Sequence, residues 1–261
     1  MIVQQPGREL LRLASRVDTA LGQMVKARAS AGLGSEWEAS RHAWALSNLV
    51  LRHSEAVVVM ARTDVVLLPG SWAAARASME IAARVSWLLS APDEWEGENR
   101  WLALLEEGAR FDEAAEQLIP HDQPMPKSAQ IREFVAAVRA KLPPERRAPV
   151  KQPRVIEMLP DGNEGLYLLY RLGSQYVHGT GYGAELYRSN LGTAAIYGER
   201  VLEADWAAPL SIAWHSFRMS GTALVSSAGM APTCNVPALS AAVEEAAQAL
   251  SSVPQPERST E

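Results

Sequence analysis

The chain is short of cysteine: Cys234 is the single one among its 261 residues. One thiol forms no intrachain disulfide, and it cannot supply the several thiolates of a structural zinc site. Nothing beside it in the sequence indicates a reactive thiol, so we expect Cys234 to be an inert side chain in the core or in a loop.

Long apolar runs are also missing. No window reaches the roughly 18 uninterrupted apolar residues of a membrane span, and charges are spread through residues 1–16, where a secretion signal would have an apolar core. We therefore expect a soluble, cytoplasmic protein with no membrane partner.

Positive charge is not in excess. The 25 Lys and Arg residues are outnumbered by 30 Asp and Glu residues, which gives a net charge of -5. This balance disfavours a protein that coats nucleic acid through bulk electrostatics. A local basic site is compatible with it, because binding depends on the field at the site.

Runs of β-branched residues are few, whereas alanine and leucine dominate the 48% of apolar residues. Apolar side chains recur at helical spacing, so we expect an all-α multi-helix bundle.

The predicted helices form a single domain over residues 1–251, and residues 252–261 are expected to form a disordered tail. Prolines and basic residues crowd residues 142–153, which we interpret as a long loop within the bundle in preference to a domain boundary. The predicted helices cover residues 8–30, 36–62, 72–89, 93–118, 128–141, 163–177, 202–228 and 237–251, with Ser35 and Ser71 as N-caps of the second and third.

Arg171 and His178 are the residues that suggest chemistry. They lie seven residues apart in a predicted helix, so both side chains share a face, about 10 Å apart along the axis. A guanidinium offers planar donors to a phosphate, and a histidine can accept a proton and return it near neutral pH. Ser174 lies between them on the same side. The glycines after His178 (Gly179, Gly181 and Gly183) are expected to form a break that opens space for a substrate.

An upstream predicted helix carries Arg76, Glu80 and Arg84 at four-residue spacing. This spacing predicts a ladder of salt bridges on one helix face. If Glu80 is buried, Arg171 or His178 would be a natural partner, and the set would become a polar part of the site.

Metal and cofactor motifs are not found. His42 and His53 are eleven residues apart, about three helical turns, which is too far for one metal ion. His121 is expected in a solvated loop and His215 in the core or a groove. We expect no metal and no cofactor.

The Arg-x6-His pattern on a helix of an all-α protein resembles the signature of the HEPN superfamily of nucleotide-binding helical proteins. More narrowly, the chain resembles a bacterial family of uncharacterised HEPN-like proteins over residues 71 to 183. The residues that carry this resemblance are Tyr170, Ser174, His178 and Gly179, with Arg76 and Glu80 upstream.

The resemblance implies a metal-independent endoribonuclease, or an RNA or nucleotide binder on the same scaffold, in a defence or toxin system with an unknown antitoxin. It implies a homodimer in which two motifs face one cleft. Arg171 would hold the scissile phosphate and His178 would move the proton, whereas Ser174, Arg76 and Glu80 would contact the substrate. The chain departs from the family pattern at Leu172, because the position after the arginine is normally polar.

Two alternatives stay open. In the first, Arg171 caps a helix or pairs with a carboxylate, and His178 is a hydrogen-bonded interior residue. In the second, the chain is a non-enzymatic helical protein that binds a partner or a small molecule.

Overall fold

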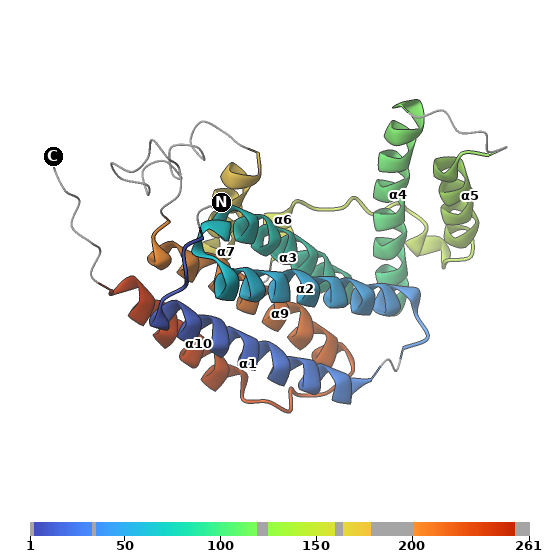
Figure 1. The fold of residues 1–261 in the computed structure, drawn as a ribbon. Helices are drawn as coiled ribbons and strands as arrows, with labels where there is room; N and C mark the ends of the chain where they lie inside the picture. The colour runs from blue at the N-terminus through green and yellow to red at the C-terminus, as the bar shows by residue number, and fades with distance from the viewer. Residues whose placement is uncertain (1–2, 33–34, 119–124, 160–163, 179–200, 254–261) are drawn as a thin grey trace.

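Every regular element in the described part of the chain is a helix (Figure 1), which confirms the predicted all-α multi-helix bundle. The computed structural model describes residues 3–32, 35–118, 125–159, 164–178 and 201–253. The elements are α1 (Arg8–Ala31), α2 (Glu38–Thr63), α3 (Leu68–Leu89), α4 (Glu94–Leu118), α5 (Lys127–Arg139), α6 (Val155–Met158), α7 (Glu164–Val177), α9 (Ala207–Ser227) and α10 (Val236–Ser251), with short 3-10 helices at Val65–Leu67, Pro144–Arg146 and Glu203–Trp206.

The predicted N-cap of α2 is wrong. Trp37, not Ser35, occupies the cap position, and the hydroxyl of Ser35 only accepts a hydrogen bond from the Trp37 amide at 3.2 Å. The amide of Ala39 in the first turn is bound instead by the carboxylate of Glu98 in α4, at 2.8 Å. A residue 59 positions away in the sequence therefore satisfies this helix end, which no local pattern reveals.

The start of α3 also differs from the prediction. The helix begins at Leu68, ahead of Ser71, because Pro69 fits the first turn, where an amide proton has no partner in the helix. Ser71 lies inside the helix, and its hydroxyl donates to the carbonyl of Leu68 at 2.7 Å. The predicted helix over 202–228 is likewise shortened, because Glu203–Trp206 forms a 3-10 turn before α9.

Buried serines join the central helices. The hydroxyl of Ser54 in α2 donates to the carbonyl of Ala213 in α9 at 3.0 Å, so Ser78 of α3 donates to Ser54, also at 3.0 Å. All three residues are buried, and their small size lets α2, α3 and α9 approach closely. The contact therefore combines dense packing with satisfied polar groups.

Arg28 is a buried cation of α1 with no carboxylate partner in the described part of the chain. Its guanidinium donates to Ser47 at 2.9 Å and to Asn48 at 2.8 Å. It also lies 4.8 Å from the ring centroid of Trp44 and 5.3 Å from that of Phe217. Burial lowers the pKa of Arg28. The hydrogen bonds of its two terminal nitrogens and the two rings replace part of the water that the guanidinium has lost.

Buried apolar side chains of the described residues form two clusters. The main apolar cluster joins α1, α2, α3, α9 and α10, and the second lies where α4 and α5 pack together, beside the end of α3. Figure 1 shows α4 and α5 side by side, extending away from the remaining helices. Ion pairs join the two helices along their length: Lys127–Asp112 at 3.1 Å, Arg139–Glu106 at 2.7 Å and Arg132–Glu113.

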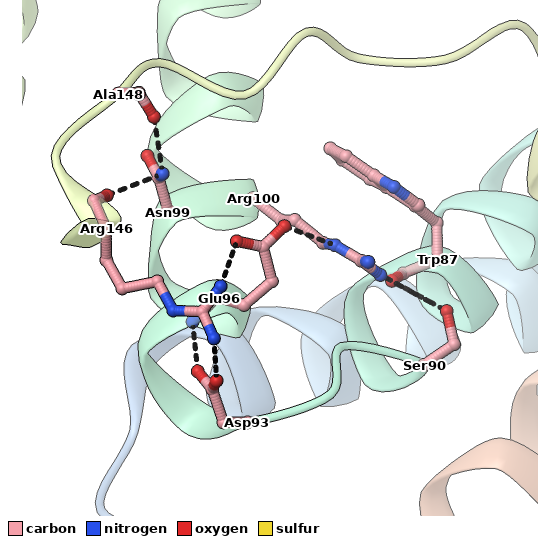
Figure 2. A network of polar contacts seen from close by, with 8 residues as sticks. All are labelled: Trp87, Ser90, Asp93, Glu96, Asn99, Arg100, Arg146 and Ala148. Carbon is pink, nitrogen blue, oxygen red and sulfur yellow. Dashed lines mark hydrogen bonds and ion pairs between the residues drawn. The ribbon is translucent and has the colours of Figure 1, made fainter.

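The proline-rich segment after α5 lies against α4 (Figure 2). The side-chain amide of Asn99 donates to the carbonyls of Arg146 and Ala148, each at 2.8 Å. The guanidinium of Arg146 pairs with Asp93 and Glu96 at the start of α4. Because Asn99 is buried, these bonds fix residues 146–148 on the surface of α4.

Two negative findings apply to the described residues. None of their helices combines the length and apolar composition that a membrane-crossing segment needs. No group of three His, Cys, Asp or Glu side chains among them is arranged to hold a metal ion.

Glu98 provides a test of the tertiary cap on α2. Burial raises the pKa of Glu98, so its ionised form costs folding free energy, and this cost disappears as the pH falls through that raised pKa. Glu98→Gln keeps an acceptor oxygen and removes the charge. We expect it to unfold in urea at pH 7 with a free energy at least equal to that of the wild type, and this advantage should shrink at acidic pH.

Glu98→Ala is the contrasting variant. It leaves the Ala39 amide without its acceptor and should cost about 1–3 kcal/mol at pH 7. Equal losses in the Gln and Ala variants at this pH would show that the carboxylate charge itself holds the two helices together.

Candidate functional site

The contact between α3 and α7 positions the predicted site. Gly173 of α7 is buried against α3, and a Cβ atom built there would lie 3.3 Å from both the Arg76 Cβ and the Trp72 ring. One turn later, Tyr176 stacks on Trp72, with ring centroids 5.4 Å apart and planes 8° from parallel. The missing side chain of Gly173 therefore lets the two helices approach closely.

Arg76 forms the polar part of the same contact. Its Nε donates to the Ser174 hydroxyl at 2.9 Å, and its Nη2 donates to the Tyr170 hydroxyl at 3.1 Å. The guanidinium also lies 4.9 Å from the centroid of the Tyr170 ring. The Ser174 hydroxyl donates to the Tyr170 carbonyl at 2.9 Å, so each of these side chains is held in place by its neighbours.

Glu80 completes this network, and the predicted ladder of salt bridges is confirmed. Its carboxylate pairs with Arg76 at 3.6 Å and with Arg84 at 3.2 Å. Arg84 pairs in turn with Glu107 of α4 at 3.3 Å. The cations that neutralise Glu80 come from its own helix, so the suggested pairing of Glu80 with Arg171 or His178 is not what the structure shows.

Arg171 of α7 and His178, the residue that directly follows α7, point to the side away from α3. The His178 amide still donates to the Ser174 carbonyl at 3.0 Å, so the helical turn continues to His178. Both residues are exposed, and neither forms an ion pair or hydrogen bond with another described side chain. At 100° per residue, both lie roughly 150° around the helix from the buried Gly173. The two side chains therefore share a solvent-facing surface, as their spacing predicts, but they are separate from the network of Arg76 and Glu80.

This placement decides the part of the first alternative that concerns His178. The interpretation of His178 as a hydrogen-bonded interior residue is wrong, because its side chain is exposed. Leu172, the departure from the family pattern, packs against the main apolar cluster. Its apolar character is therefore explained by packing. The glycines 179, 181 and 183 lie outside the described residues.

Tyr170 belongs to the site although sequence reasoning assigned it no role there. It binds Arg76, and its hydroxyl donates to Glu80 at 3.5 Å. Its four-residue spacing from Ser174 is a signal that could have identified it, because residues one turn apart face the same neighbour.

The other histidines do not form a site among the described residues. Burial lowers the pKa of His42 and of His53. Burial, together with the nearby charge of Arg218, lowers the pKa of His215 to about 4. These imidazoles are therefore mainly neutral at pH 7. His121 lies outside the described residues.

Comparison of the chain with protein-family models, with curated proteins and with solved structures found no match. The resemblance to HEPN proteins therefore stays a prediction.

The close approach of α7 to α3 at Gly173 can be tested by comparing alanine substitution there with alanine substitution at Gly22, a glycine that has open space around it. In α1, a Cβ at Gly22 would meet nothing within 4 Å, so Gly22→Ala should stabilise the protein by about 0.5–1 kcal/mol through helix propensity. Gly173→Ala gains the same propensity, but the Arg76 Cβ and the Trp72 ring, each 3.3 Å from the new Cβ, must shift by a few tenths of an ångström. Because neither is the free end of a flexible side chain, we expect a net loss of about 1–3 kcal/mol. Urea unfolding and amide exchange in α7 measure both. Equal stabilisation by the two variants would contradict the close contact.

Proposed function

We propose that this chain binds RNA along the outer face of α7 and cleaves it without a metal ion, with Arg171 and His178 as the functional pair. The observation that carries the proposal is their shared exposure: two side chains suited to a phosphodiester, one on α7 and one directly after its last residue, project into solvent on the same side.

The local charge supports binding of a phosphate. Arg171 is the single charged residue between Gly165 and Val177, and it has no ion pair with a described residue. Its guanidinium is therefore not neutralised along its own helix, although the whole chain is acidic. Planar N–H donors of this kind suit two oxygens of one phosphate.

In the proposed reaction, the imidazole of His178 takes the proton of a ribose 2′-hydroxyl as its oxygen attacks the adjacent phosphorus. The new O2′–P bond forms while the P–O5′ bond breaks, and the departing 5′-oxygen takes a proton from water. Arg171 stabilises the negative charge that develops on the phosphoryl oxygens. The products are a 2′,3′-cyclic phosphate and a 5′-hydroxyl, and His178 returns its proton to solvent.

The network on α3 supports this proposal indirectly. Arg76, Tyr170 and Ser174 bind one another and fix α7 on α3. We therefore assign Arg76, Glu80 and Ser174 to positioning of the helix that carries Arg171 and His178. Substrate contact by these three residues stays a prediction. Pairing of two motifs in a homodimer, a cytoplasmic location and a role in defence rest on the sequence and the resemblance alone.

A non-catalytic interaction is the second candidate function. Leu168, one turn before Arg171, is 70% exposed, which is a large apolar exposure on an outer helix face. An apolar residue beside a cation suits a protein partner as well as RNA.

RNA binding and cleavage are tested with a fluorescent single-stranded RNA in EDTA. We expect Arg171→Gln to weaken binding about 5- to 100-fold and to flatten its salt dependence, because one phosphate contact is lost. His178→Ala should retain binding and lose cleavage by about 100-fold or more. An RNA with 2′-deoxyribose at the cleaved position should bind and stay intact.

Arg16→Gln is the matched control, because Arg16 is an exposed arginine on α1 whose side chain has no described ion pair. It should leave both binding and cleavage unchanged. Binding without cleavage in the wild type would reduce the proposal to an RNA-binding protein. Absence of binding would remove it and favour the protein partner.

A further inference from the structure

The outer half of α4 exposes large apolar side chains. Phe111 is 75% exposed and Leu118 is 82% exposed, and Phe134 of the neighbouring α5 is 48% exposed. Phe134 contacts the ring of Trp101, with centroids 6.1 Å apart, on the flank of α4 that faces α5. Phe111 and Leu118 therefore remain as large apolar side chains of α4 that no described residue covers.

The spacing on α4 is that of a helix-pairing seam. Gly108, Phe111, Ala115 and Leu118 follow one another at intervals of three, four and three residues. This is the pattern of the a and d positions in a coiled coil, which places all four on one stripe. A Cβ atom built at Gly108 would meet nothing within 4 Å, so the stripe has an open notch at this glycine.

Large and small residues on this stripe are arranged symmetrically about Glu113. Leu118 and Gly108 are each five residues from it, and Phe111 and Ala115 are each two residues from it. If two copies of α4 lie antiparallel and centred on Glu113, each Leu118 faces the Gly108 notch of the other copy. Each Phe111 then faces an Ala115. A two-fold axis brings one patch against itself in this way.

The charges of α4 permit this approach although the helix is strongly acidic. Several of its carboxylates already bond to other helices of their own chain. Glu107 pairs with Arg84 of α3, and Glu116 accepts from Ser128 of α5 at 3.0 and 2.6 Å. The remaining pairs with α5 are those of Glu106, Asp112 and Glu113. Two such helices therefore repel each other less than their sequence suggests.

We propose that a second copy of this chain docks on α4 in an antiparallel arrangement, so that the outer halves of the two α4 helices pack against each other. The contact inserts Leu118 into the Gly108 notch and Phe111 against Ala115. It does not depend on the proposed function, because α7 is not part of this surface.

The arrangement is tested by disulfide cross-linking in full-length protein that carries Cys234→Ser. The double variant Gly108→Cys with Leu118→Cys should form a covalent dimer on mild oxidation, because these positions face each other across the axis. Neither single variant should do so, because like positions would lie about 15 Å apart along the helices. Cross-linking of the single variants as readily as the double would overturn the antiparallel arrangement.

Sedimentation velocity at about 50 µM tests the contact without cysteines. The wild type should be a dimer, and Phe111→Asp should weaken the association about 100-fold or more by placing a charge in the seam. Gly108→Leu should weaken it as well, by filling the notch. Val59→Asp is the matched control: Val59 of α2 is 60% exposed and lies outside the surface, so its variant should stay dimeric.

A folded, monomeric wild type at this concentration would overturn the proposal, and so would a dimer that Phe111→Asp leaves intact. RNA binding by a dissociated Phe111→Asp variant would separate the two proposals, because it would show α7 working without the α4 contact.

Discussion

The close contact between α2, α3 and α9 is the constraint on which the described structure depends. Serines and alanines at this contact let the helix backbones approach, and the bonds among Ser54, Ser78 and Ala213 satisfy the polar groups that are buried there. α3 is placed by this contact on one side and receives α7 on the other. The orientation of α3 therefore sets the position of Gly173 and, through it, the direction in which Arg171 projects.

Polar groups near α7 are of two kinds: those paired between α3 and α7, and those exposed to solvent on the other side of α7. Arg76, Glu80, Tyr170 and Ser174 bind one another between helices, where their donors and acceptors are engaged and the geometry is fixed. Arg171 and His178 lie in solvent, where a ligand has access to them. Residues that are already paired inside a contact are suited to holding a helix, whereas exposed groups with no partner in the described part of the chain are suited to binding. The α7 helix carries both kinds on its two sides.

The helices themselves were predictable, because apolar spacing and prolines act locally. The pairing of Arg76, Glu80 and Arg84 was predictable for the same reason, since one turn of a helix brings these residues together. The cap of α2 was not predictable. The acceptor is the carboxylate of Glu98, which lies on α4. Ser35 has a side chain suited to an N-cap, but the cap position is two residues later, at Trp37. The role of Tyr170 was not predictable either, because its partners Arg76 and Glu80 lie on α3 and their position depends on how α3 packs.

The sequence by itself determined that the chain is helical, where most helices lie, and that Arg171 and His178 share a face, because these properties depend on neighbours within a few turns. Only the tertiary structure decided which face of α7 is buried, since this depends on the shape of α3 at Trp72 and Arg76. The open notch at Gly108 and the partial burial of Leu172 were decided in the same way, by whether distant side chains pack against these residues.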